Sequence, residues 1–320
     1  MIYINGILKS LAKINIQRRS KGVCILRLDN VSKSFGKNKV LDNISFSINE
    51  GEIVGFVGPN GVGKTTTIRI ITNLIHPDKG NINICGYDLQ KEREKALSCI
   101  SAIVENPGLY TFLSGKDNID FIRKINGVSK EKMNDVINYM GLSNRINDIV
   151  KTYSLGMKQR LALGICLLTE PKLLILDEPT NGLDPSGTIE LRKTIVNLSK
   201  KNKISIFMSS HILSEVEKIC DRVIFIKDGR INSIKSNENI KNSQTFKVYI
   251  AETEKAEKLI KNCDFINGYT INNNEFLINM DNKNLNDLLK LFMHNELDYT
   301  GIEIVNSMLE DEYSKIYGGK

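Results

Sequence analysis

The chain has 320 residues, of which 41% are hydrophobic and 25% charged, a composition typical of a folded globular protein and not of a disordered or fibrous chain. The formal net charge of +7 is uneven, because residues 1–22 carry +5, residues 23–235 carry +7 and residues 236–320 carry −5. The sequence has no run of 18 apolar residues, which argues against a transmembrane helix, and its length suits one large and one small domain.

Charge and cysteine spacing indicate the possible ligands of the chain and the state of its thiols. A modestly basic middle segment is compatible with nucleic acid, an acidic lipid surface or a polyphosphate ligand, and charge alone does not choose among them. The six cysteines have irregular spacings and no C-x-x-C pair. This pattern favours free thiols in a reducing compartment over a disulfide framework or a zinc site.

Residues 1–22 form a basic, apolar extension that differs from the rest of the chain. They lack the long apolar region and the small-residue cleavage site of a secretory signal. Two interpretations stay open. The segment is a membrane-surface helix, or translation starts near Val23 and residues 1–22 are not part of the protein.

Residues 23–235 are predicted to form one α/β cassette. Residues 106–170 lack strong strand signals and are predicted to be helical. The later predicted strands are continuously apolar, as expected of strands buried on both faces of a sheet. The strands are predicted at residues 25–31, 44–48, 53–57, 173–176, 204–208 and 223–226, and a helix at 66–75.

A polar, turn-prone linker is predicted at residues 236–244, followed by a small α+β domain at residues 245–320. Its predicted strands are residues 246–250, 275–280 and 302–305, and its predicted helices are residues 252–261 and 284–292.

The strongest motif is at residues 58–65, Gly-Pro-Asn-Gly-Val-Gly-Lys-Thr, which fits G-x-x-x-x-G-K-[ST] between a predicted strand and a predicted helix. Glycines let successive backbone N–H groups point at phosphate oxygens, and the helix N-terminus adds partial positive charge. Lys64 is expected to contact the β- and γ-phosphates of ATP, and the Thr65 hydroxyl is expected to bind Mg²⁺. The predicted ATP-binding residues of this segment are Gly58, Pro59, Asn60, Gly61, Val62, Gly63, Lys64, Thr65 and Thr66.

Two carboxylates, Asp177 and Glu178, follow the apolar run at residues 173–176. Ligands of open α/β sheets bind at the carboxyl ends of the strands. Asp177 is therefore a candidate Mg²⁺ ligand, directly or through water. Glu178 is the candidate general base that activates the attacking water.

Between these motifs, residues 153–160 read Tyr-Ser-Leu-Gly-Met-Lys-Gln-Arg. Here the chain resembles the nucleotide-binding subunits of ABC transporters, whose signature is L-S-G-G-Q followed by Gln-Arg. Ser154 and Gly156 match this signature, whereas Tyr153, Leu155 and Met157 depart from it. The resemblance implies that Ser154, Gly156 and Met157 contact an ATP molecule held by a second subunit, so that a dimer closes over two ATP molecules.

The same resemblance implies further roles. Phe35 corresponds to the aromatic residue that stacks on adenine, Asp184 to a loop residue that crosses the dimer interface, and His211 to the histidine that contacts the γ-phosphate and orients the water. Glu178, His211 and Lys64 are thus the expected catalytic residues.

The fold that the resemblance implies is a P-loop NTPase cassette with a RecA-like core, an antiparallel β subdomain and a helical subdomain, followed here by the small α+β domain.

Glu105 is an informative departure, because the family normally has Gln at this position. A carboxylate there can still bind Mg²⁺, and we expect it to do so through water. Together with the signature variant, Glu105 resembles the branch that serves bacitracin resistance and lantibiotic immunity. The C-terminal residues 307–319 resemble that branch loosely.

The predicted function is therefore that of an ATPase, with ATP and Mg²⁺, which powers the export of an antimicrobial peptide or drug. Its expected partners are a separate membrane permease, docked near residues 105–120, and a second ATP-binding subunit in a homodimer; no nucleic acid partner is expected. The expected location is the cytoplasmic face of a bacterial cell membrane.

Two alternatives to transport fit the sequence less well. A non-transport ABC ATPase that acts on DNA would carry long coiled coils, yet Lys64 and Ser154 are only 90 positions apart without sustained heptads. One that acts on the ribosome would carry two cassettes. An unrelated P-loop enzyme such as a kinase would need neither the signature nor His211.

Overall fold

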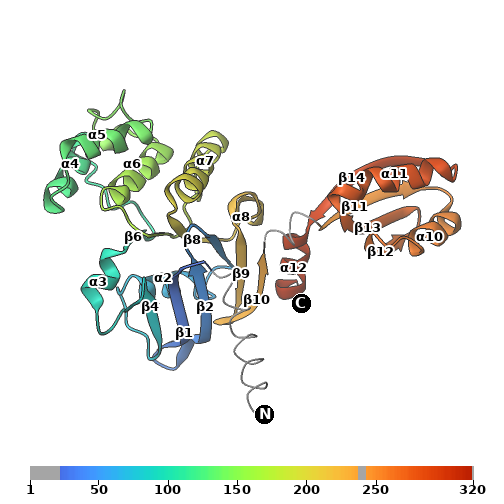
Figure 1. The fold of residues 1–320 in the computed structure, drawn as a ribbon, viewed down its shortest axis with the longest axis horizontal. Helices are drawn as coiled ribbons and strands as arrows, with labels where there is room; N and C mark the ends of the chain where they lie inside the picture. Colours follow the sequence, from blue (N-terminus) through green and yellow to red (C-terminus); the bar gives the residue numbers. More distant parts are fainter. Residues whose placement is uncertain (1–21, 237–242, 319–320) are drawn as a thin grey trace, which may run out of the picture.

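The computed structural model describes residues 22–236 and 243–318, which form three β-sheets with helices around them (Figure 1). The N-terminal extension and most of the predicted linker lie outside the described residues, so the expectations for them stay predictions. No helix in the described part of the chain is long and apolar enough to cross a membrane.

The central sheet has six strands in the order β10-β9-β3-β8-β7-β6. All neighbouring pairs from β9 to β6 are parallel, and β10 runs antiparallel to β9 at one edge. The bounds are β3 (Ile53–Val57), β6 (Ile100–Ile103), β7 (Leu173–Leu176), β8 (Ser205–Ser210), β9 (Arg222–Lys227) and β10 (Arg230–Ser236).

Alternate residues of these strands enter two separate hydrophobic cores, one on each face of the sheet. In β3, Ile53 and Val57 belong to one core, and Val54 and Phe56 belong to the other. All five residues of β3 are buried. The continuous apolar runs in the sequence are explained by this burial on both faces.

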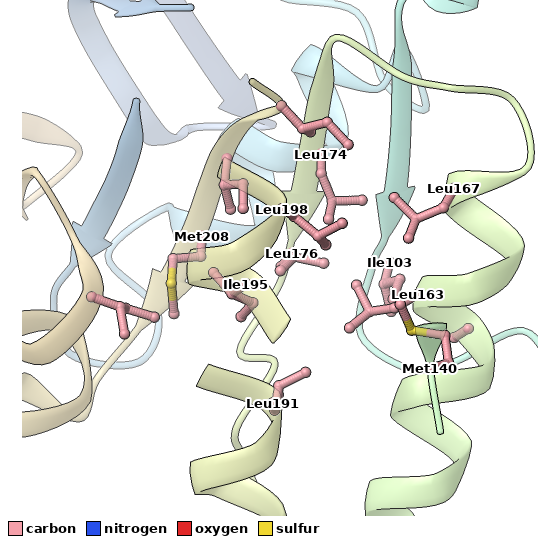
Figure 2. Packing of buried hydrophobic residues seen from close by; sticks show 14 of the residues in the cluster. Ile103, Met140, Leu163, Leu167, Leu174, Leu176, Leu191, Ile195, Leu198 and Met208 are labelled. Atoms are coloured by element: carbon pink, nitrogen blue, oxygen red, sulfur yellow. The ribbon is translucent and has the colours of Figure 1, made fainter. Parts of the chain in front are cut away.

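The first core lies between the sheet and the helices α6 (Leu155–Leu167), α7 (Pro185–Asn202) and α8 (Leu213–Ile219). Figure 2 shows Leu174 and Leu176 of β7 packed between side chains of α7 and of α6. The predicted helical segment also contains α4 (Gly115–Ile125), α5 (Lys130–Tyr139) and the 3-10 turn Val150–Thr152. No strand is assigned among residues 106–170, all of which the structure describes, so this expectation is confirmed.

The second core joins the central sheet to an antiparallel sheet of order β2-β1-β4-β5 and to helix α2. Phe207 of β8 lies with its ring centroid 5.4 Å from those of both Phe46 and Phe56, and so links the two sheets. The bounds are β1 (Cys24–Phe35), β2 (Asn38–Asn49), α2 (Lys64–Ile71), β4 (Lys79–Ile84), β5 (Tyr87–Asp88) and α3 (Arg93–Ser98).

The C-terminal segment forms a third sheet of order β12-β13-β11-β14 with its own hydrophobic core. Its chain order is β-α-β-β-α-β, an α+β arrangement that agrees with the expected class. The bounds are β11 (Ser243–Ile250), α10 (Thr253–Lys261), β12 (Ile266–Asn272), β13 (Glu275–Asp281), a 3-10 turn Asn282–Asn284, α11 (Leu285–His294) and β14 (Tyr299–Ser307).

The last helix, α12 (Met308–Tyr317), leaves this third sheet and packs on the cassette near α8 and β9 (Figure 1). Leu309 and Ile316 are buried in the same core as Val57 and Phe225. The sequence did not predict this helix or its return to the cassette.

Several predicted elements differ from the observed ones in their ends. The first two strands are longer than predicted because they form one long antiparallel hairpin whose polar ends are held by strand pairing. Helix α2 starts at Lys64 instead of residue 66 and ends at Ile71 instead of residue 75. Its early end agrees with the left-handed backbone of Asn73, whose φ is 56°.

Candidate nucleotide site

Four parallel strands bring the predicted nucleotide residues to one edge of the central sheet. The phosphate loop follows β3, Asp177 and Glu178 follow β7, and His211 follows β8. Glu105 follows β6, two residues beyond the strand. Because these strands are parallel, their carboxyl ends lie at the same edge, where α/β sheets bind ligands.

The phosphate loop turns sharply through glycines into the start of α2. Gly61 and Gly63 have left-handed φ values of 84° and 110°. A Cβ on Gly58 would lie 2.7 Å from the Ile226 carbonyl oxygen, and one on Gly63 would lie 2.5 Å from a methyl of Leu41. Both positions therefore require glycine, and the N-terminal amides of α2 open toward the loop.

Lys64 is the first residue of α2, and its side chain is buried, with 6% of its surface exposed. Its Nζ donates hydrogen bonds to the carbonyl oxygens of Gly58 at 2.6 Å and of Pro59 at 3.1 Å. The same Nζ lies 3.2 Å from Glu178 Oε1. The ammonium group thus joins the phosphate loop to the candidate base.

The two carboxylates are held by a buried hydroxyl. Ser209 donates to Asp177 Oδ1 at 2.6 Å and accepts a hydrogen bond from the Glu178 backbone amide at 2.8 Å. Asp177 is 4% exposed and Ser209 is fully buried. Sequence reasoning missed Ser209, although a hydroxyl directly after the apolar residues 206–208 was a signal for it.

Glu178 lies between two partners. Its Oε2 is 2.7 Å from His211 Nδ1, which is the donor when that ring nitrogen carries the proton. Its Oε1 is buried and accepts no hydrogen bond of good geometry from the described residues, and Lys64 balances its charge. The Glu178 backbone has a left-handed φ of 49°, an uncommon conformation for a non-glycine residue and one often found at functional sites.

Glu105 forms an ion pair with Arg69 of α2. Glu105 also has a left-handed φ, of 62°. Arg69 offsets the negative charge that Glu105 brings close to the phosphate loop. No local pattern in the sequence predicts this pairing, because the two residues are 36 positions apart. The phosphate loop and these side chains line a pocket of 340 Å³, formed by Asn60, Gly61, Gly63, Lys64, Thr65, Thr66, Arg69, Glu105 and Glu178.

Phe35 ends β1 and is 50% exposed, so its ring is available for stacking. The Lys33 Nζ lies 5.5 Å from the ring centroid and is held by Asp78 at 2.9 Å. Exposure of a large aromatic side chain at a strand end argues against a core role for Phe35.

The signature residues and Asp184 do not line this pocket but lie beside one another. Ser154 caps α6 by accepting a hydrogen bond from the Met157 amide, and Asp184 caps α7 in the same way from Gly187. A Cβ on Gly156 would lie 3.7 Å from Gly187, so the two helix starts are neighbours. The Ser186 hydroxyl, followed by the Gly187 amide, holds the pKa of Asp184 below its ordinary value.

No group of three or more His, Cys, Asp or Glu side chains in the described part of the chain is arranged to hold a metal ion. The Thr65 hydroxyl and the Asp177 carboxylate fit Mg²⁺, which usually takes one or two protein oxygens and completes its shell with phosphates and water. Thr65 and Asp177 are the oxygen ligands predicted at this edge.

Comparison with known proteins decides the family. The family model described as ABC transporter matches residues 41–181. A Bacillus subtilis protein named uncharacterized ABC transporter ATP-binding protein YhcH is 40% identical over 92% of this chain and 96% of its own length. The chain belongs to the ATP-binding subunits of ABC transporters.

Other relatives of this ABC subunit agree with the branch predicted from the sequence. The bacitracin transport ATP-binding protein BcrA of Bacillus licheniformis is 37% identical over 92% of this chain and 98% of its own length. The lantibiotic transport ATP-binding protein SrtF of Streptococcus pyogenes is 43% identical over 65% of this chain and 89% of its own length. The predicted family and its resemblance to this branch are confirmed.

The fold of the ABC subunit is also that of solved cassettes. A structure described as the ATP-binding subunit of an ABC transporter shares 30% identity and a TM-score of 0.61, over 68% of this chain and 92% of that chain. Subunits of this family bind ATP, hydrolyse it to drive transport, dimerise and work with membrane permease components. The predicted P-loop fold and ATPase class are confirmed, whereas the roles of individual residues stay predictions.

Proposed function

We propose that this ABC subunit hydrolyses ATP with Glu178 as general base and that the hydrolysis powers export of an antimicrobial peptide or drug. The contact that carries the catalytic part of the proposal is the 2.7 Å distance between Glu178 Oε2 and His211 Nδ1. A carboxylate fixed by a histidine is oriented to accept a proton from water. Its other oxygen faces Lys64, at the base of the phosphate loop.

The phosphates of ATP are proposed to lie on the amides of residues 58–66, with Lys64 turned toward the β- and γ-phosphates. Phe35 stacks on adenine. Thr65 and Asp177 hold Mg²⁺, and Glu105 reaches it through water. When bound, the Mg²⁺ ion offsets phosphate charge during transfer to water.

A homodimer is proposed as the active unit, because the signature residues lie outside the pocket that contains the phosphate loop. Ser154 and Gly156 are exposed or half-buried beside Asp184, and Met157 is half-buried. This arrangement supports a site completed by the signature of a second copy. The N-terminal amides of α6 are then directed at the γ-phosphate of the partner's ATP.

The permease is proposed to dock on an aromatic cluster that follows Glu105. Tyr110, Phe112 and Phe121 are 45%, 72% and 45% exposed. The ring centroid of Tyr110 lies 6.1 Å from that of Phe112 and 5.7 Å from that of Phe121. The side chain of Asn118, which is 2% exposed, holds the Tyr110 backbone through two hydrogen bonds at 2.8 Å and 3.0 Å. Exposed aromatic side chains on a fixed backbone are typical of interface anchors.

Export of a peptide antibiotic is proposed from the relatives named for bacitracin and lantibiotic transport, together with Glu105 at the position where the family normally has Gln. The subunit is proposed to act at the cytoplasmic face of a bacterial membrane, where its permease would hold it.

The test compares cells that lack the gene, restored with the wild-type gene or with the Lys64→Ala variant, on bacitracin and a panel of lantibiotics. We expect sensitivity to rise on deletion and to be reversed only by the wild type, because Lys64→Ala removes the charge that holds the phosphates. Unchanged sensitivity across the panel would exclude the proposed cargo class.

The permease contact is tested separately by detergent purification of the tagged chain from native membranes. We expect the wild type to carry an integral membrane protein and Phe112→Asp to lose it while the isolated chain keeps its ATPase rate. Co-purification with ribosomes or DNA, and not with a membrane protein, would exclude the transport role.

A further inference from the structure

Helix α12 contacts the base of the phosphate loop through Tyr317. The Tyr317 hydroxyl donates a hydrogen bond to the Ile226 carbonyl at 2.6 Å, and the Val57 carbonyl lies 3.3 Å away. Val57 is the last residue of β3, directly before the phosphate loop, and Ile226 follows Phe225, the β9 residue that is paired with Val57. A residue from the C-terminal end of the chain therefore touches both strands where the loop begins.

Ile226 is itself packed against the loop. Its carbonyl oxygen lies 2.7 Å from the position of a Cβ on Gly58, and its Cδ1 lies 3.5 Å from the corresponding position on Gly63. The two glycines bracket the phosphate loop. The Ile226 carbonyl that Tyr317 holds is therefore the same group against which the first loop glycine fits.

The helix is fixed in this place by packing and charge. Leu309 and Ile316 are buried in the cassette core. The Lys227 ammonium donates to the Ile316 carbonyl, one of the carbonyls left without a helical partner at the C-terminal end of α12. Lys235 of β10 pairs with Glu312 at 3.3 Å.

The hydroxyl remains a donor across the neutral range. Burial, followed by the nearby Tyr313 and Asp228 groups, raises the pKa of Tyr317 above its ordinary value. The ring is also held by Tyr313, whose centroid lies 4.4 Å away.

We propose that Tyr317 is a positioning residue for ATP binding: its hydroxyl fixes the β3–β9 end against which the phosphate loop closes, and so ties the C-terminal segment to the nucleotide site. Neither the cargo nor the permease takes part in this contact. Helix α12 thus affects the ATPase independently of the small sheet that precedes it.

The test is Tyr317→Phe in the full chain, with kcat and KM for Mg-ATP measured beside the wild type and the Tyr313→Phe control. One hydrogen bond changes an equilibrium by about three- to tenfold. We therefore expect KM to rise about three- to tenfold in Tyr317→Phe with kcat within about twofold, because the loop amides bind the ground state and the transition state alike. Tyr313→Phe should match the wild type.

A second variant, Lys227→Met, loosens the end of α12 while leaving the Tyr317 hydroxyl in place, and we expect KM to rise in the same direction. A purely structural role would lower the active fraction, and hence the apparent kcat, at unchanged KM. The proposal is overturned if Tyr317→Phe leaves KM unchanged, or if Tyr313→Phe raises it equally.

Discussion

Glu178 lies at the centre of the nucleotide site. Its carboxylate contacts His211 and faces Lys64, and its backbone amide donates a hydrogen bond to the Ser209 hydroxyl. Three of these four residues could be predicted from the sequence. The phosphate loop and the acidic pair are local motifs, because consecutive backbone and carboxylate groups must act on one ligand. Arg69 could not be predicted, because its partner Glu105 is distant in sequence and is brought close only by the fold. Ser209 was missed although its hydroxyl follows an apolar run, because its partner Asp177 follows a different strand.

Ser209→Ala tests the role of the buried hydroxyl. The variant removes the donor to Asp177 and the acceptor for the Glu178 amide, and leaves both as buried groups without that partner. We expect a loss of stability of about 1–3 kcal/mol, measured by urea unfolding, and a lower rate of ATP hydrolysis.

Ser186→Ala serves as the control for that variant, because its hydroxyl bonds the exposed Asp184 and should contribute less to stability. Equal effects of the two variants on the free energy of unfolding would show that Ser209 does not order the carboxylates.

At the scale of elements, continuous apolar runs predicted the inner strands correctly, because burial on both faces makes the central positions of these strands apolar. Strand β12 was missed, since Asn267, Gly268 and Thr270 are exposed and weaken its strand pattern. Strand β10 was missed for a related reason, because it is an edge strand whose residues alternate between exposed and half-buried. Pairing with a neighbour, which a local pattern does not contain, holds both strands in the sheet.

Phe207→Ala tests the packing between the two sheets of the cassette. The Phe207 side chain is fully buried between Phe46 and Phe56. We expect a loss of about 3–5 kcal/mol in the free energy of unfolding, because a large cavity replaces the ring.

Phe112→Ala removes a ring that is 72% exposed, and it should change the free energy of unfolding by less than about 0.5 kcal/mol. Comparable losses in both Phe→Ala variants would contradict the assignment of Phe207 to the core that joins the sheets.

At the scale of the whole molecule, the uneven charge pattern now corresponds to different parts of the fold. The basic middle segment forms the cassette, where Lys64 and Arg69 face the phosphate loop and Glu105. The acidic C-terminal segment forms the third sheet and then returns through α12 to the same cassette. The sequence predicted a separate α+β unit here, but not the return, because docking of a short amphipathic helix depends on tertiary contacts with α8 and β9.

A dimer that closes over ATP accounts for the division of the functional residues into two groups. The phosphate loop, Asp177, Glu178 and His211 lie at one edge of the sheet, and the signature lies beside the Asp184 loop. The edge with the phosphate loop lacks a signature, and the signature lacks a phosphate loop beside it. We therefore propose that two copies form the active unit, each supplying its signature to the phosphate loop of the other.

The most direct measurement is the rate of ATP hydrolysis by the purified full chain and by its Glu178→Gln variant, with nucleotide binding measured on the same samples. We predict that the variant binds ATP, accumulates an ATP-dependent dimer on size exclusion and hydrolyses ATP more slowly by a factor on the order of 10²–10⁴. Turnover by Glu178→Gln equal to that of the wild type would contradict the account.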